Sequence, residues 1–299
     1  MRYAAIDIGT NSCRLLIAEI REGRLFPLCK KIKTTRLGEG LEASGEISFG
    51  AVKRAVCCLQ EFKSIVDKYE VKIYQAVATS AIREASNRDE FLSLAENRCG
   101  LLVKIISGEE EAWLSYWGVK RGLDLKAPPL VADLGGGSTE LILRNGEQFL
   151  ISLPIGAVKA TESNMSPGQI ENAVAKISKN RERFTRNPLV FVGGTATSLV
   201  AIKKSLQEYR SDLVHGQVLT REEIAAIYSM LENMPLVRRR ELPGLQPERA
   251  DIILQGILIL VAIMDALGKK EITVSDSDLL EGIVWQLQEK PAVAKDGGQ

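Results

Sequence analysis

The chain has 299 residues, enough for one large domain or for two of ordinary size. Apolar residues make up 45% and charged residues 26%, which is typical of a soluble globular protein. Since 39 basic residues nearly balance 38 acidic ones, the net charge is +1. No global field therefore attracts nucleic acid or a membrane, and affinity for a polyanion must come from local clusters.

The cysteines and the single histidine exclude several kinds of site. The five cysteines are odd in number and form no C-x-x-C pair, which argues against a disulfide framework and a zinc site. His215 is the only histidine, so a Ser-His-Asp triad and a histidine-rich metal site are set aside. The N-terminus lacks a signal-peptide pattern. We therefore expect a cytoplasmic protein that binds neither nucleic acid nor a membrane.

The first predicted elements recur further along the chain. The segment IDIGTNSCRLLI begins at Ile6, and the segment ADLGGGSTELIL begins at Ala132. In the superposition of the two segments the aspartates, central glycines and serines coincide: Asp7 with Asp133, Gly9 with Gly135, and Ser12 with Ser138. Each copy predicts a strand, a Gly/Ser loop, a second strand, a charged turn at residues 21–23 or 144–146, and a third strand.

The predicted elements that follow also correspond. Apolar spacing predicts helices over residues 51–69 and 166–184, the second with Ser166 and Pro167 as N-cap and first helical residue. Strands are predicted over residues 71–79 and 189–197. The most apolar stretch, residues 252–264, is shorter than the roughly 20 residues that cross a bilayer, and it predicts a buried helix. We expect two α/β domains that meet at a cleft, a boundary near residues 125–129 and a disordered tail over residues 291–299.

The two aspartate-led loops are the strongest chemical signals. Glycines let backbone N–H groups approach phosphate oxygens closely, and serine or threonine hydroxyls add donors. An aspartate before the glycines would repel phosphate, unless it holds a metal ion directly or through water. One glycine-rich turn is weak evidence, but two aspartate-led copies favour a phosphate-binding cleft.

Two further segments contain candidate site residues whose roles the sequence pattern leaves open. The sequence SGEEEA at residues 107–112 has the composition of a helix N-terminus, yet one glutamate could face the cleft as a general base. Spacing alone does not choose among Glu109, Glu110 and Glu111. Arg83 follows the predicted strand over residues 71–79, where it could bind phosphate or lie exposed at a helix start.

Taken together, these motifs resemble the exopolyphosphatase / guanosine pentaphosphate phosphohydrolase (Ppx/GppA) family of the actin-like ATPase superfamily. The resemblance rests on IDIGTNS from Ile6, ATSAIREA from Ala78, ISGEEEA from Ile106 and DLGGGSTEL from Asp133. The segments GGTATSL, PGLQPERAD and VSDSDLLEG agree as well, and the similarity extends over nearly the whole chain. SGEEEA is the most specific of these motifs.

The resemblance implies an α/β fold of two ribonuclease-H-like domains flanking an interdomain cleft, residues 1–125 and 126–277, with a last helix near 278–290 returning to the first domain. It implies Mg²⁺-dependent water attack on a terminal phosphoryl group. Glu111 would be the catalytic base, and Asp133 and Glu140 would hold the metal. The implied phosphate-binding residues are Asp7, Gly9, Thr10, Asn11, Ser12, Arg83, Gly135, Gly136, Gly137, Ser138 and Thr139. A homodimer is also expected from the family.

The expected substrate is inorganic polyphosphate. Longer family members add C-terminal helical domains, so we expect a preference for short chains here. Hydrolysis of guanosine pentaphosphate (pppGpp) in the same site is the nearest alternative. An actin-like kinase or chaperone is a second class, and a non-catalytic polyphosphate or alarmone sensor a third. The presence of Glu111, Asp133 and Glu140 argues against a sensor.

Overall fold

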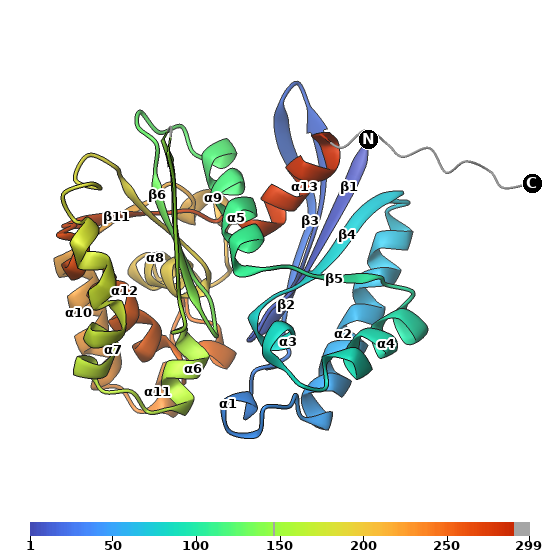
Figure 1. Cartoon of the computed structure of the whole chain (residues 1–299), viewed down its shortest axis with the longest axis horizontal. Coiled ribbons are helices and arrows are strands. Elements are labelled where there is room, and N and C mark those ends of the chain that lie inside the picture. Colours follow the sequence, from blue (N-terminus) through green and yellow to red (C-terminus); the bar gives the residue numbers. More distant parts are fainter. Residues whose placement is uncertain (146, 290–299) are drawn as a thin grey trace, which may run out of the picture.

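The computed structural model describes residues 1–145 and 147–289, which form two α/β lobes side by side (Figure 1). The first lobe is built on a mixed sheet of order β3-β2-β1-β4-β5, and the second on a mixed sheet of order β10-β11-β9-β6-β7-β8. The fold class predicted from the sequence is confirmed. Gly146 and the predicted tail at residues 291–299 lie outside the described residues.

The first lobe contains β1 (Arg2–Ile8), β2 (Ser12–Arg21), β3 (Arg24–Thr34), α1 (Leu41–Ser44), α2 (Phe49–Lys68), β4 (Ile73–Ala78), α3 (Ser80–Glu84), α4 (Arg88–Cys99), β5 (Val103–Ile105) and α5 (Gly108–Gly122). The second contains β6 (Leu130–Leu134), β7 (Thr139–Asn145), β8 (Glu147–Leu153), α6 (Ala157–Glu162), α7 (Pro167–Val174), the 3₁₀ segment η1 (Ala175–Asn180), β9 (Leu189–Val192) and α8 (Gly194–Lys203). It continues with α9 (Ser211–Val214), β10 (Val218–Thr220), α10 (Arg221–Glu232), α11 (Leu236–Arg239), the 3₁₀ segment η2 (Pro247–Arg249), α12 (Ile253–Leu267) and β11 (Glu271–Val274). The described chain ends with α13 (Leu279–Glu289).

The sequence repeat is a structural repeat. In each lobe two antiparallel hairpins join the first three strands, and a parallel strand, β4 or β9, lies on the other side of the first. The pairing sets Asp7 opposite Arg14 and Asp133 opposite Glu140. The alignment made from the sequence alone is therefore the alignment of the strands.

Helices α5 and α13 lie between the two sheets (Figure 1). Apolar residues of α13, among them Leu279 and Ile283, pack on β1 and β2, whereas Tyr116 and Val119 of α5 pack on the second sheet. The two helices approach closely at Gly282, where a Cβ atom would lie 1.9 Å from the carbonyl oxygen of Leu114. The outer faces of the sheets are covered by α2 and α4 in one lobe and by α12 with its neighbours in the other. We propose that α13 belongs to the first domain and that the boundary falls near residue 125.

The predicted helices differ from the structure in one respect. The helix expected over residues 166–184 begins as predicted, with a Ser166 capping box and Pro167 in the first turn, but it ends at Val174. A 3₁₀ segment continues to Asn180, because Ile177 is buried three residues after Val174 and three residues make one turn of a 3₁₀-helix. The strand predicted over residues 189–197 ends at Val192, where the chain turns into α8.

The apolar stretch at residues 252–264 is the buried core of α12. Within residues 1–145 and 147–289, no helix has the length and apolar character needed to cross a membrane.

Candidate active site

The loops that follow β1 and β6 have the same backbone turn. The N–H of Gly9 donates to the carbonyl of Ser12 (3.1 Å), and the N–H of Gly135 donates to the carbonyl of Ser138 (3.0 Å). We call residues 9–12 the first glycine loop and residues 135–138 the second. Each places an aspartate, Asp7 or Asp133, two residues before the loop.

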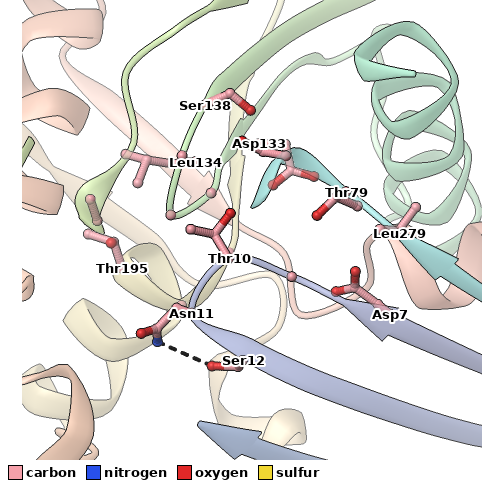
Figure 2. Close-up of a pocket in the computed structure, with 18 of the residues that line it drawn as sticks. Asp7, Thr10, Asn11, Ser12, Thr79, Asp133, Leu134, Ser138, Thr195 and Leu279 are labelled. Carbon is pink, nitrogen blue, oxygen red and sulfur yellow. Dashed lines mark hydrogen bonds between the residues drawn. The ribbon is translucent and has the colours of Figure 1, made fainter. Parts of the chain in front are cut away.

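The two glycine loops face each other across the cleft. Thr10 lies beside the second loop (Figure 2), where a Cβ atom on Gly136 would come within 2.9 Å of the Thr10 Cβ. On Gly137 a Cβ atom would lie 2.3 Å from the hydroxyl of Ser80. Glycine is therefore required at both positions, because Thr10 and Ser80 of the first lobe leave no room for a Cβ atom on this loop of the second lobe.

The cavity between the loops gathers most of the predicted site. Eleven of the fourteen predicted residues line it: Asp7, Gly9, Thr10, Asn11, Ser12, Glu111, Asp133, Gly135, Gly136, Gly137 and Ser138. The wall is completed by residues that include Thr79, Ser80, Gly193, Gly194 and Thr195. Two of these, Thr79 and Ser80, belong to the ATSAIREA segment at the end of β4, and the sequence predicted a site role only for Arg83 of that segment.

Glu111 shares the first turn of α5 with Glu109 and Glu110, and it is the one of the three that lines the cavity. Ser107 caps this helix through its hydroxyl, and the N–H of Glu111 donates to the Ser107 carbonyl (2.9 Å). One helical turn thus directs Glu111 into the cavity, while the carboxylate of Glu110 pairs with Lys104 at the surface. Arg83 donates to the Glu111 carboxylate at 3.2 Å and to the Ile106 carbonyl at 2.9 Å.

Three acids lie close enough to perturb one another. Burial raises the pKa of Asp133 to about 6, with Asp278 adding to the shift, and burial together with Asp133 raises the pKa of Glu140 to about 7. The pKa of Glu111 is raised well above its ordinary value by burial and then by Glu140 and Asp133, against the lowering effect of Arg83. A site that crowds carboxylates in this way requires a cation or retains protons.

The remaining three predicted residues lie off the cavity wall. Glu140 is buried behind it, accepts a hydrogen bond from Ser152 (2.9 Å) and lies near the Cβ position of Gly108. Arg83 is held against Glu111 as described above. Thr139 is fully buried, and its hydroxyl donates to the Ile155 carbonyl (2.7 Å) and so braces the β8–α6 connection.

The first lobe has a different charge arrangement. Arg14 donates to Asp7 at 2.8 Å and forms a second ion pair with Asp278, at the start of α13. Burial opposes the charge of Arg14, but Asp278 and Asp7 outweigh burial and raise its pKa well above the ordinary value. Burial raises the pKa of Asp7, while Arg14 lowers it. The other carboxylate oxygen of Asp7, Oδ1, is buried and has no hydrogen-bond partner among residues 1–145 and 147–289.

Arg249 is a cavity residue that the sequence did not single out. Its guanidinium covers Gly194, where a Cβ atom would lie 1.9 Å from Nη1, and its Nε donates to Gln246 (3.0 Å). Burial, and then Arg14, lower its pKa to about 10. A buried cation at a glycine-rich helix start suits an anionic ligand. The chemical pattern of its segment, PGLQPERAD, carries no signal for this role.

The acidic side chains of the site provide oxygen donors, the kind of ligand that Mg²⁺ binds. Within the described ranges 1–145 and 147–289, no three His, Cys, Asp or Glu side chains come together as a metal-binding group. Mg²⁺ needs fewer, because it keeps several waters and binds through one or two carboxylates and the substrate phosphates. Asp133, Glu140 and the unpartnered oxygen of Asp7 are oxygen donors of the right kind, so the residues present fit this ion.

The fold and the site define a class of protein: a phosphohydrolase whose cleft joins two glycine loops to a buried glutamate. The comparisons agree. Residues 16–290 match the Ppx/GppA phosphatase family. Exopolyphosphatase 2 of Mycobacterium tuberculosis is 32% identical over 96% of this chain and 98% of its own length. The bifunctional 3-dehydroquinate synthase/phosphatase of Fusobacterium nucleatum is 34% identical over 95% of this chain, which spans only 46% of that protein.

Solved structures give the same result. A Ppx/GppA family member from Aquifex aeolicus is 33% identical, with a TM-score of 0.77 over 98% of this chain and 99% of that one. An exopolyphosphatase from Cytophaga hutchinsonii is 25% identical, with a TM-score of 0.87 over 96% and 98%. The chain belongs to the Ppx/GppA phosphatase family, and it is a phosphatase.

Proposed function

We propose that this protein is a cytoplasmic, Mg²⁺-dependent exopolyphosphatase that removes the terminal phosphate of inorganic polyphosphate and prefers short chains. One observation carries the proposal: the two glycine loops and Glu111 converge on a single cavity. The exopolyphosphatase names of the Mycobacterium tuberculosis and Cytophaga hutchinsonii proteins support the substrate. A homodimer stays a prediction.

In the proposed mechanism, each residue has a stated task. The glycine loops, with Ser80 and Arg249, bind the terminal phosphates through N–H, hydroxyl and guanidinium donors. Glu111, held by Arg83, accepts a proton from the attacking water, which is a general-base contribution of about 10²–10⁴ in rate. Asp133 and Glu140, with Asp7, would hold Mg²⁺, which when bound neutralises charge on the transferred phosphoryl group.

The preference for short chains is supported by the charges beside the cavity. A second cavity adjoins the first through Arg14, Arg249 and the start of α8, and Lys30 and Lys31 add to its cations. Arg14 is already paired with two aspartates, and Lys30 is paired with Asp276 and Glu281. Because few cations here are uncompensated, a short run of phosphates would meet most of the available positive charge.

The same second cavity favours guanosine pentaphosphate as the alternative substrate. Much of its lining is apolar, and Tyr209, with 47% of its surface exposed, lies on its wall with its hydroxyl donating to Asp276. A tyrosine ring offers a stacking surface for a purine. The sequence does not reveal this pocket, because two of its lining residues, Tyr209 and Ile32, are far apart along the chain.

The test is phosphate release from tripolyphosphate, long-chain polyphosphate, guanosine pentaphosphate and ATP, with Mg²⁺ and with a chelator. We expect release from tripolyphosphate to be fastest and to stop in the chelator. Faster release from guanosine pentaphosphate, together with a loss of that preference in Tyr209→Ala, would establish the alternative. Tight binding of all four substrates without release would instead identify a sensor.

A further inference from the structure

Residues 35–38, between β3 and α1, brace the first glycine loop. The N–H groups of Thr35 and Arg36 donate to the carbonyl of Asn11 at 3.0 and 2.9 Å, and the N–H of Gly38 donates to the carbonyl of Thr10 at 2.9 Å. Two loop carbonyls are thereby held toward residues 35–38. A loop that binds an anion benefits from this arrangement, because carbonyl oxygens in the cavity would repel phosphate.

The side chain of Arg36 reaches the other lobe. Its Nη1 pairs with Oδ2 of Asp251 at 2.9 Å, and its Nη2 donates to the carbonyl of Glu248 at 2.9 Å. The backbone of Arg36 has a φ of 50°, a conformation that is uncommon for a residue other than glycine and that surrounding contacts must hold. A planar guanidinium suits this two-point contact better than an ammonium group.

The partners of Arg36 flank residues of the cavity wall. Glu248 and Asp251 belong to the same short segment as Arg249 and Ile252, which line the cavity. Arg36 is thus bonded through its backbone to the first glycine loop and through its side chain to the segment that carries Arg249.

The second glycine loop is braced in a similar way from α6. The first N–H groups of α6, those of residues 157–159, donate to the carbonyls of Gly135 and Gly136 at 2.9–3.1 Å. The same helix contacts the first lobe, since Lys159 pairs with Glu42 at 2.9 Å and Glu162 accepts from the N–H of Gly40 at 2.9 Å. Each glycine loop is therefore held by a segment that also crosses the cleft.

We propose that Arg36 is a positioning residue that couples closure of the cleft to the geometry of both glycine loops. Arg36 with its partners Glu248 and Asp251, and the contacts of residues 40 and 42 with α6, form a clasp at one side of the cleft. The clasp touches no reacting atom. Its formation sets the backbone of both loops and the place of Arg249 together, and its release frees them together.

Hydrogen–deuterium exchange tests the coupling without any catalysis. In Arg36→Ala we expect amides of residues 156–160, in the other lobe from the substitution, to exchange at least about fivefold faster than in the wild type, while amides of α12 are unchanged. Arg221→Ala is the matched control, because Arg221 pairs with Asp265 through two 3.0 Å bonds within one lobe. That control should leave residues 156–160 at the wild-type rate.

Kinetics with tripolyphosphate and Mg²⁺ test the consequence, and this arm alone rests on the proposed function. We expect Arg36→Ala to lose about tenfold or more in kcat/KM, because a small misplacement of the loops is costly, and Arg36→Lys to recover little of it. Asp251→Asn should reproduce part of the defect, and the double variant should be no worse than Arg36→Ala alone, since both changes remove the Arg36–Asp251 ion pair. Asp251→Asn also serves as the test variant if Arg36→Ala fails to fold.

The outcomes separate the two proposals. Unchanged exchange at residues 156–160 in both Arg36→Ala and Asp251→Asn overturns the coupling, whatever the activity. Wild-type protein that releases no phosphate from any polyphosphate overturns the proposed function and leaves the exchange result standing. Additive kinetic losses in the double variant would show that Arg36 does not act through Asp251.

Discussion

In the first lobe Asp7 lies opposite Arg14, and in the second Asp133 lies opposite Glu140. The backbone around these pairs is the same: a strand, a glycine loop closed by one hydrogen bond, and a returning strand. The two pairs differ in one charge: the residue opposite the aspartate is the cation Arg14 in the first lobe and the anion Glu140 in the second. Arg14 compensates Asp7 and Asp278, whereas Glu140 adds to the charge of Asp133.

The comparison shows how one repeated strand–loop–strand unit can serve two different chemical roles. In the first lobe the ion pairs engage one oxygen of Asp7 and leave the other without a hydrogen-bond partner in the described part of the chain. In the second, Asp133, Glu140 and Glu111 of α5 form an acidic cluster whose repulsion favours a cation or a proton. Proton transfer is thus expected where Glu111 of the first lobe meets the acids of the second, and both glycine loops are expected to bind the phosphates.

The largest expected effect follows from replacing Glu111, the residue of α5 that lies close to Asp133 and Glu140 of the second lobe. Glu111→Gln keeps the size of the side chain and can still accept from Arg83, but it cannot take up a proton. We expect kcat for tripolyphosphate to fall about 10²–10⁴-fold with little change in substrate binding. Single-turnover phosphate release and calorimetric binding would check this, with Glu110→Gln as the control. A fall of less than fivefold would remove Glu111 from the mechanism.

The next largest effect is expected from removing the positive charge of Arg14, which pairs with Asp7 and Asp278 in the first lobe. Arg14→Met leaves the buried carboxylates of Asp7 and Asp278 unpaired, which we expect to cost about 3–5 kcal/mol in the free energy of unfolding. The loss should shrink as the pH falls and Asp7 takes up a proton. Urea unfolding at pH 5 and pH 8 measures both effects. A loss below 1 kcal/mol at pH 8, on the scale expected of surface pairs, would show that the ion pairs compensate little.

A smaller effect is expected from the raised pKa values of the second lobe. With a chelator present, the folded protein keeps protons on Asp133 and Glu140 that the unfolded chain releases from about pH 4 upward, since their folded pKa values are about 6 and 7. The unfolding free energy should therefore fall as the pH rises from 4 to 7, by about 2–3 kcal/mol for each of the two groups.

Mg²⁺ should reverse this trend, because it binds the deprotonated acids of the folded state. Thermal unfolding with and without Mg²⁺ would show a larger stabilisation at pH 8 than at pH 5. Glu140→Gln should flatten the pH dependence. Equal stabilisation by Mg²⁺ at both pH values in the wild type would place the metal elsewhere.

The smallest effect distinguishes Thr10 of the first glycine loop from Thr139, the first residue of β7. Thr10 lines the cavity, whereas Thr139 donates to the Ile155 carbonyl inside the second lobe. We expect Thr139→Val to cost about 1 kcal/mol in stability and to leave kcat/KM within twofold, and Thr10→Val to raise KM with little loss of stability. Steady-state kinetics and urea unfolding of both variants provide the check. A raised KM in Thr139→Val alone would mean that its hydroxyl turns toward the ligand.

The sequence by itself determined the repeated frame. Asp-led glycine loops between apolar runs fix a strand, a turn and a returning strand through local backbone preferences, and the overlay of Glu140 on Arg14 follows from counting residues. The buried helix α12 and the N-cap at Ser166 could also be predicted from the sequence, because both depend on residues that are close together along the chain. The family resemblance added Glu111 and Arg83, which spacing left undecided.

Only the tertiary structure decided which side chains share the cavity. That Glu111, and neither Glu109 nor Glu110, lines the cavity depends on where α5 lies between two sheets, and the placement of Arg249 depends on a glycine in another helix. The cross-cleft contacts of Arg36 join residues more than 200 positions apart. Such contacts depend on the packing of one lobe against the other, and no local pattern in the sequence records that packing.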